Sequence, residues 1–347
     1  AKTIKKFNTK DLSFACRQMS AMMSSGLSLV KALDILAKEQ EKKAYKLIWQ
    51  NIYEEVQKGQ SLSEACASLG GVFPDFFLSM IGAGESSGML DMVMNRLSEH
   101  YLKENKLNNK IKGALTYPIV LLVLCFVLVI GMFTFILPQF KGLMGEGEMP
   151  ALTAALFAFS EFIIAKWYVL LIAIFIIAVV IVYVLKIPST RLKIDKFLLI
   201  CPKVGKLLTT VYTGRFARTM SSLYSSGIPM VECLERSSRV LGNSYIDKAF
   251  EKVVDDVKQG TAISKAVAET EIFESMFCSI IYVGEESGAL DSILEKTAEY
   301  YEDEADTAIG KLVGLMEPLM IIIMGCAVAC LLAAIFPMLY GNMNNLG

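Results

Sequence analysis

The strongest enzyme-like string in the sequence is GESSG at 84–88, which matches the GxSxG pattern of hydrolase nucleophiles. That chemistry needs a strand before the serine, a helix after it and a histidine base elsewhere in the chain. The residues before Ser86 have helical spacing, and the related string at 284–288 has Glu286 at the nucleophile position. The one histidine, His100, falls in the middle of an expected helix and is interpreted as a helix-surface residue. The sequence therefore argues against hydrolysis.

Other catalytic patterns are also missing from the sequence. No GxxxxGK[ST] string occurs, so the chain offers no P-loop for nucleotide phosphates, and an energy-driven process would need hydrolysis by another protein. The eight cysteines include no CxxC pair that would indicate zinc binding or redox chemistry. We therefore expect a non-enzymatic protein with no catalytic residue, no cofactor and no metal site.

The elements around these strings are dominated by apolar residues. The chain has 347 residues, 54% of them apolar, and a mean hydropathy of +0.48, which is high for a soluble protein. Three stretches without a charged side chain lie at 119–137, 167–185 and 319–340, and each is long enough to cross the apolar part of a bilayer. The sequence therefore predicts a multi-pass membrane protein with three transmembrane helices and its termini on opposite sides.

Basic residues near the expected spans give their orientation. Lysines cluster before the first span, and lysines and an arginine cluster after the second, at Lys103, Lys106, Lys110, Lys112, Lys186, Arg191, Lys193 and Lys196. Positive residues favour the cytoplasmic side. Five cysteines also fall in the segments expected to be cytoplasmic, and none falls in the external ones, as a reducing interior would favour. The predicted order is a cytoplasmic domain at 1–116, a span at 117–137, an external segment at 138–166 with an amphipathic helix at 150–165, a span at 167–185, a second cytoplasmic domain at 186–317, a span at 318–340 and an external tail at 341–347.

The two cytoplasmic segments differ in charge. Residues 1–116 carry 16 basic and 12 acidic side chains, whereas residues 186–317 carry 16 and 20. Neither is basic enough to predict nucleic acid as a direct partner. The acidic run at 302–306 has no match in the first segment, which is basic at 99–103, and it is interpreted mainly as a solvated helix face. A partner that distinguishes the two segments by charge is the alternative.

An internal repeat joins these two segments. The string from Arg17 to Gly26 matches the one from Arg218 to Gly227, and GESSGMLD at 84–91 matches GEESGALD at 284–291. The match continues into the first and third spans, so the repeat unit is one cytoplasmic domain plus one span. Both copies point the same way, which makes this a parallel duplication.

Each repeat unit has the pattern of a small helical bundle. Apolar residues recur at helical spacing, Gly26 and Gly59 stand where helices end, Ser28 and Ser61 stand where helices begin, and Ser61 with Glu64 forms a capping box. The predicted fold class is therefore an all-α membrane protein, with two repeated bundles of about six helices each and three transmembrane helices.

The repeated loop is the main candidate for a partner interface. Its glycines permit a turn between helices, its serine is expected to cap the next helix, and its aspartate falls in that helix's first turn. The glutamate has no such duty, so a contact with a partner or with the other repeat is expected. The candidate residues are Gly84, Glu85, Gly88, Asp91, Gly284, Glu285, Gly288 and Asp291.

The three expected spans have no Asp, Glu, Lys, Arg or His, which disfavours a transporter or channel. Such helices suit an anchor or a packing surface for other apolar helices. Pro118 and Pro318 mark the expected junctions between each cytoplasmic domain and its span.

Together, the two helical repeats, the SSGLSL and SSGIPM turns, the paired glycine–glutamate loops and the two prolines resemble one family. It is the PilC/GspF family, the membrane platform proteins of type IV pilus assembly and type II secretion. The resemblance runs from about Leu12 to Tyr340, although the segment before the first domain is shorter here than in some members.

The resemblance implies a non-enzymatic, oligomeric protein of the bacterial inner membrane, with a cytoplasmic N-terminus and an external C-terminus. It implies coupling of a hexameric cytoplasmic ATPase to insertion or extraction of pilin or pseudopilin subunits, together with other membrane proteins of the machine. The glycine–glutamate loops are the family's signature positions. A passive membrane scaffold or receptor that docks cytoplasmic partners is the alternative interpretation.

Overall fold

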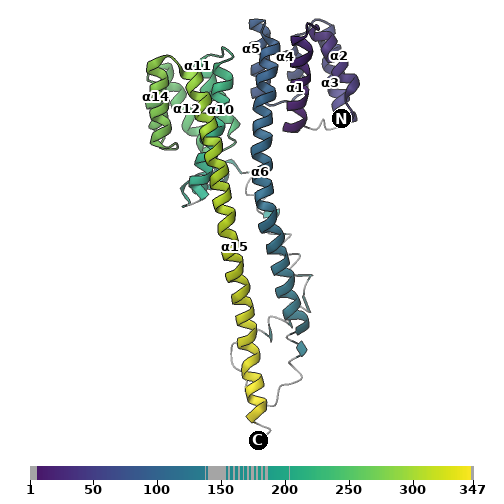
Figure 1. Ribbon diagram of the computed structural model, residues 1–347, viewed down its shortest axis with the longest axis vertical. Helices are drawn as coiled ribbons and strands as arrows, with labels where there is room; N and C mark the ends of the chain where they lie inside the picture. The colour runs from purple at the N-terminus through teal and green to yellow at the C-terminus, as the bar shows by residue number, and fades with distance from the viewer. Residues whose placement is uncertain are drawn as a thin grey trace. The chain divides into compact units, whose positions relative to one another are not determined.

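The computed structural model in Figure 1 describes residues 6–136, 138–139, 187–202 and 204–344, together with isolated residues between 154 and 183. The described residues are helical throughout their regular elements. They form two compact units, Ala1–Lys110 with Leu192–Thr307, and Ile111–Arg191 with Ala308–Gly347. The first unit holds both repeated bundles, and the second holds the apolar helices.

The first bundle consists of five helices and the start of a sixth. These are α1 (Thr9–Ser24), α2 (Leu29–Glu39), α3 (Lys43–Gln57), α4 (Leu62–Ala67), α5 (Asp75–Ser87) and α6 (Leu90–Gly131). Their apolar faces meet in a core around Trp49, Phe77 and Tyr101, all of which are almost completely buried. Stacking of Phe73 on Phe77, with ring centroids 4.7 Å apart, joins the loop before α5 to this core.

The second bundle repeats this order. After α9 (Pro188–Ile200) come α10 (Val204–Tyr224), α11 (Met230–Val240), α12 (Ser244–Lys258), α13 (Ile263–Ala268), α14 (Ser275–Ser287) and α15 (Leu290–Asn344). Phe277 and Tyr301 occupy its core at the positions of Phe77 and Tyr101. The prediction of two repeated helical bundles of about six helices each is therefore confirmed in the described part of the chain, with α9 as an addition before the second copy.

Local sequence signals set the helix ends as expected. Ser28 begins α2, where its side chain accepts a hydrogen bond from the backbone of Lys31. Ser61 and Glu64 form the predicted capping box at the start of α4. Gly26 follows α1 with a φ of +89°, a conformation that glycine adopts at little cost. These short-range features depend on neighbouring residues alone.

Two helices are long and apolar enough to cross a membrane: the segments Leu90–Gly131 and Leu290–Cys330. The expected junctions at Pro118 and Pro318 lie inside these helices, because α6 and α15 are continuous through both prolines. Helix α6 is followed by a short π-helical turn, η1 (Met132–Ile136), and α15 extends to Asn344, beyond the predicted end of the span at 340. Most of the external segment at 138–166, with its amphipathic helix, and most of the expected span at 167–185 lie outside the described residues.

Candidate functional site

The GESSG string does not form a nucleophile elbow. Residues 84–87 lie inside helix α5, and the Ser86 hydroxyl donates to the backbone carbonyl of Gly82 at 2.8 Å. Ser87 likewise donates to Ala83, so the expected capping of the next helix by serine is wrong. A helix on the N-terminal side excludes the strand that this chemistry requires.

The cysteine thiols of the bundles are equally unsuited to nucleophilic chemistry. Burial raises the pKa of Cys16 and Cys66 and raises that of Cys233 to about 12. These thiols stay protonated near neutral pH, and the thiolate is the reactive form. Among the described residues, no group of histidine, cysteine or carboxylate side chains has the arrangement of a metal site.

The two glycines of the first loop have different roles. Gly88 ends α5 with a φ of +72°, and the backbone N–H groups of Gly88 and Met89 donate to the carbonyls of Glu85 and Gly84 in a Schellman motif. Gly84 lies inside the helix, where a methyl group would stand 3.0 Å from the side chain of Val93. Gly84 thus allows α5 to pack closely on α6, whereas only Gly88 makes the turn.

Glu85 caps a helix that lies more than 20 residues earlier in the chain. Its carboxylate accepts hydrogen bonds from the backbone N–H groups of Leu62 at 2.5 Å and Ser63 at 3.0 Å, and from the Ser63 hydroxyl at 2.6 Å. These amides are the unpaired donors at the start of α4, where the helix dipole also favours negative charge. The carboxylate therefore ties α5 to the N-terminus of α4.

Glu285 does the same in the second bundle. It accepts hydrogen bonds from the backbone N–H groups of Ile263 at 2.6 Å and Ser264 at 2.8 Å, at the start of α13. The residue before this helix is Ala262, which offers no side-chain cap. The expectation that the two glutamates have no capping duty is therefore wrong. Their described hydrogen bonds stay within their own repeat, and a contact with a partner remains a prediction.

The remaining predicted site residues occupy their expected helices. Asp91 and Asp291 lie in the first turns of α6 and α15, as the sequence predicts. Gly288 ends α14 with a φ of +67°, and Gly284 is buried against Leu290. The structure therefore gathers the candidates into two separate, equivalent sites, one at each junction between the fifth and sixth helix of a bundle.

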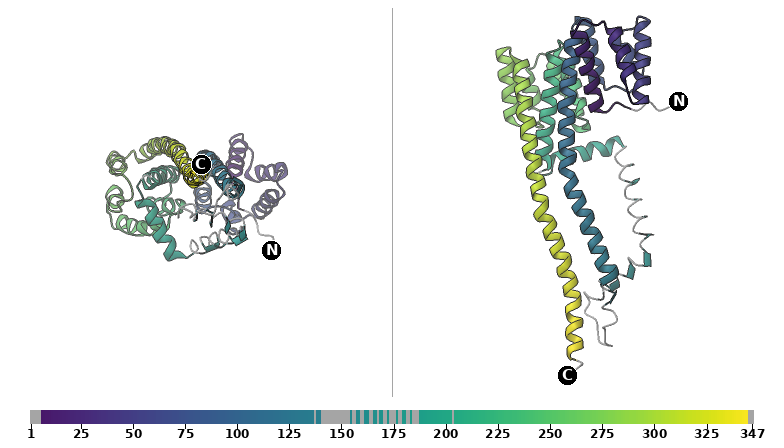
Figure 2. Two further views of the ribbon diagram at one scale, coloured as in Figure 1. Left: turned by 90° about the horizontal axis from the view of Figure 1, so that it is seen from below. Right: turned by 45° about the vertical axis from the view of Figure 1, so that its right-hand side comes forward.

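A second cluster, missed by the sequence reasoning, lies where the two bundles meet. Lys103 of α6 forms an ion pair with Glu299 of α15 at 3.2 Å, and Lys110 pairs with Asp306 in the same way. Both pairs join residues 196 positions apart, so α6 and α15 run parallel along this contact. Figure 2 shows the two helices side by side in both views. Each pair joins a lysine of the first repeat to a carboxylate of the second, and the interpretation of 302–306 as a mainly solvated face is wrong for Asp306.

His100 is at the centre of this cluster and is not a surface residue. Its side chain is 6% exposed and packs on the ring of Phe76, with centroids 4.3 Å apart. Burial, followed by the charges of Arg218 and Arg215, lowers its pKa to about 3. Its Nδ1 atom has no hydrogen-bond partner among the described residues. The imidazole is therefore neutral at physiological pH.

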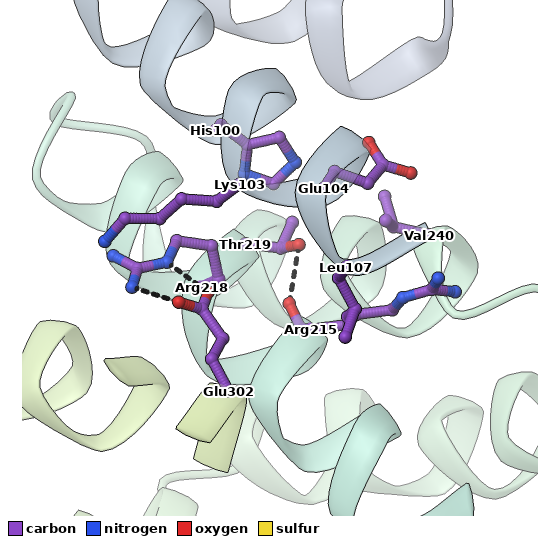
Figure 3. A pocket seen from close by; sticks show the side chains of 9 residues that line it. All are labelled: His100, Lys103, Glu104, Leu107, Arg215, Arg218, Thr219, Val240 and Glu302. Atoms are coloured by element: carbon purple, nitrogen blue, oxygen red, sulfur yellow. Dashed lines mark hydrogen bonds and ion pairs between the residues drawn. The ribbon is translucent and has the colours of Figure 1, made fainter. Parts of the chain in front are cut away.

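A cavity of about 30 Å³ beside His100 is lined by charged groups of both bundles, as Figure 3 shows. Arg218 donates to both carboxylate oxygens of Glu302, at 2.8 and 3.0 Å, within the second bundle. Arg215 crosses to the first bundle and donates to Asn108 at 2.7 Å. Burial raises the pKa of Glu104 in the same cavity, and the charge of Arg215 opposes that shift. The contact between the repeats is thus a polar one.

One sequence signal could have indicated this contact. The two repeats carry opposite charges at comparable places in their sixth helices, and a duplicated pair of helices with opposite charges can bind each other. The glutamate caps had no comparable local signal, because the residues they join are separated by more than 20 positions. Only the repeated occurrence of the glutamate pointed to a common role.

The fold and these sites define a class: an all-helical protein built by tandem duplication, in which each copy joins a helical bundle to a long apolar helix. The chain belongs to the family described as type II secretion system (T2SS), protein F, which matches residues 15–138 and 216–337. The two matched ranges coincide with the two repeats and confirm the resemblance drawn from their motifs.

Named relatives come from both pilus assembly and secretion. The chain is 34% identical over 344 residues to the type IV pilus assembly protein PilC of Thermus thermophilus, covering 97% of this chain and 84% of the relative. It is 32% identical to PilC of Myxococcus xanthus, covering 94% and 79% of the two chains. It is 29% identical to the type II secretion system protein F of Vibrio cholerae, covering 98% and 84%.

Proposed function

We propose that this protein is a non-enzymatic membrane platform of a type IV pilus or type II secretion machine. It lies in the bacterial inner membrane as a multi-pass protein, with a cytoplasmic N-terminus and an external C-terminus. It associates with further copies of itself and with other membrane proteins of the machine, and it couples a hexameric cytoplasmic ATPase to insertion or extraction of pilin or pseudopilin subunits.

The observation that carries this proposal is the continuity of α6 and α15. Each helix begins inside a polar bundle and continues without a break into an apolar segment, so a helix and not a loop would carry a displacement of the bundle toward the membrane. A loop at this point would absorb that displacement. In this proposal, motion of each cytoplasmic bundle passes into its apolar segment through the continuous helices that contain Pro118 and Pro318.

The apolar segments offer a surface for another apolar helix. Tyr117, Leu121 and Cys125 of α6 and the part of α15 from Met320 to Leu332 line an open, mostly apolar groove of about 670 Å³. Among the lining residues Glu317 is the one carboxylate, and it lies next to Pro318. This chemistry suits the apolar helix of a pilin, because closely packed apolar side chains are what joins helices within a bilayer.

The experiment is a pull-down of the full chain, in lipid nanodiscs, with the assembly ATPase of the same organism, combined with measurement of ATP turnover. Binding with altered turnover supports the platform. If a chain with intact bundles neither binds the ATPase nor changes its turnover, the passive scaffold or receptor becomes the better interpretation.

The glutamate loops need a more careful test, because Glu85 and Glu285 cap helices. Their joint replacement by alanine is expected to abolish pilus assembly. Because the same replacement is expected to speed hydrogen exchange at the starts of α4 and α13, loss of assembly counts as a partner contact only if it exceeds the loss in a variant that weakens these helix starts to the same extent without changing Glu85 or Glu285. Normal assembly by the double variant would remove both residues from the mechanism.

A further inference from the structure

The two repeats contact each other through different faces. The first bundle contributes α5 and α6, whereas the second contributes α10, α11 and α15. We define the α5–α6 face by Phe76, Ser79, Ala83, His100, Lys103 and Leu107, and the α10 face by Arg215, Arg218, Thr219 and Ser222. Because the two bundles are copies of one unit, each has an equivalent of both faces. This head-to-tail contact uses the α5–α6 face of the first bundle and the α10 face of the second, so it leaves the α10-like face of the first bundle and the α5–α6-like face of the second uncovered.

The uncovered counterpart in the second bundle is the α14–α15 face, defined by Met276, Ser279, Val283, Tyr300, Asp303 and Thr307, each 200 positions after its equivalent. Its side chains are exposed where those of the α5–α6 face are buried or half-buried. Met276 is 48% exposed against 2% for Phe76, and Tyr300 is 47% exposed against 6% for His100. The result is an exposed surface that combines the apolar residues Met276 and Val283 with the aromatic ring of Tyr300 and the carboxylate of Asp303.

The uncovered counterpart in the first bundle is the α1 face, defined by Phe14, Arg17, Gln18 and Ala21, each 201 positions before its equivalent on α10. Phe14 is 58% exposed and Arg17 is also exposed, whereas Arg218 at the equivalent position is 8% exposed. The α1 face therefore combines an exposed aromatic ring with an exposed guanidinium.

The charges on these two faces are complementary. In the second bundle, Arg218 is paired by Glu302 of its own α15. The first bundle has Leu102 at the position of Glu302, so α6 offers Arg17 no carboxylate there. On the opposing side, Asp303 stands where the α5–α6 face has Lys103. A head-to-tail contact between two chains would bring Arg17 of one to Tyr300 and Asp303 of the other.

From this geometry we infer that the α14–α15 face binds the α1 face of a second copy of this chain, in the same head-to-tail manner as the two repeats within one chain. A contact of this kind leaves the same faces open at its two ends, so it extends to further copies and builds a ring or an open array. By the same correspondence, Asp91 and Glu99 of the incoming copy, at the positions of Asp291 and Glu299, are like charges near Asp303, which limits the strength of each contact. The inference rests on the self-association within the proposed function and not on coupling to an ATPase.

The test is photocrosslinking of the full chain in its membrane, with p-benzoylphenylalanine in place of Tyr300 and two differently tagged copies expressed together. The expected product joins two copies and maps to α1, between Thr9 and Ser24. The matched control places the same probe at Leu47, which is 54% exposed on α3 of the first bundle and belongs to neither face. It should give no such product.

Charge reversal then tests the pairing itself. Arg17→Glu and Asp303→Arg are each expected to lower the yield of the crosslink about fivefold, and the two together should restore it to within about twofold. Restoration also shows that the single variants fold. A product that joins Tyr300 to another protein, a product confined to one chain, no product at all, or failure of the double variant to recover would each overturn the inference. If the crosslink between copies forms as expected but the chain does not change the ATP turnover of the ATPase, the proposed coupling to the ATPase is refuted and the contact between copies stands.

Discussion

Removal of the Glu285 carboxylate should loosen the start of α13 selectively. The two backbone N–H groups at this helix end, those of Ile263 and Ser264, donate to one carboxylate at 2.6 and 2.8 Å. Ala262 provides no replacement cap. A hydrogen bond to a charged group contributes about 1.5–3 kcal/mol, and the interaction of the carboxylate with the helix dipole adds a few tenths. Because the two bonds share one acceptor group and are partly accessible to water, we expect a loss of about 2 kcal/mol for Glu285→Ala.

Hydrogen exchange followed by mass spectrometry measures this loss in the full chain. A change of about 2 kcal/mol in local opening corresponds to about 30-fold faster exchange. The acceleration should be confined to α13 and the adjoining part of α14. Glu85→Ala should accelerate exchange of α4 less, because the Ser61 and Glu64 capping box remains in place there. The matched control is Glu286→Ala, which removes the neighbouring, exposed carboxylate.

The reasoning would be refuted if Glu285→Ala left exchange of α13 within threefold of the unmodified chain. An equal acceleration in Glu286→Ala would also contradict it, because the effect would then follow from lost charge and not from the cap. A Glu285→Gln variant separates the two contributions, since the amide oxygen still accepts one hydrogen bond but carries no charge.

Three further changes follow from the packing of the bundles. Arg218→Gln should destabilise the second bundle by about 3–5 kcal/mol, because it leaves the Glu302 carboxylate without its partner, and thermal unfolding of the full chain in detergent would show this as a lower melting temperature. Lowering the pH from 7 to 5 should lower the free energy of unfolding by up to about 2 kcal/mol. In the unfolded state His100 takes up a proton near pH 6.5, whereas the folded imidazole, with a pKa of about 3, does not. A His100→Tyr variant should lose this component of the pH dependence of unfolding. Gly84→Ala should cost about 1–3 kcal/mol in the same assay because the new methyl group meets Val93 at 3.0 Å, whereas Gly82→Ala, with its nearest neighbour at 3.9 Å, should be neutral or stabilising.

The features predicted most securely from the sequence depend on short-range chemistry and on repetition. Helix starts at Ser28 and Ser61 and the helix end at Gly26 follow from groups within a few residues of each other. The duplication followed from direct comparison of the two halves of the sequence, and it led to the family. Apolar composition over 20 or more residues identified two long helices without any tertiary information.

The prolines marked the junctions between each bundle and its span, but not the form of the chain there. Pro118 and Pro318 both lie inside continuous helices. Proline removes one backbone donor and disfavours a helix interior, but helices in apolar surroundings tolerate it because neighbouring groups satisfy the freed carbonyl. The balance depends on the environment of the helix, which the local sequence does not contain.

Burial and pairing of charged groups were decided by the tertiary structure alone. The sequence shows His100 between a glutamate and a tyrosine on an expected helix, but its burial depends on the approach of α10 from the other repeat. The role of Glu85 similarly depends on α4, whose first amides lie 22 and 23 positions earlier. Sequence by itself thus determined that a helical bundle forms twice and where several of its helices begin and end. The fold determined which charges meet, because a hydrogen bond or an ion pair is specified by distance in space and not by separation along the chain.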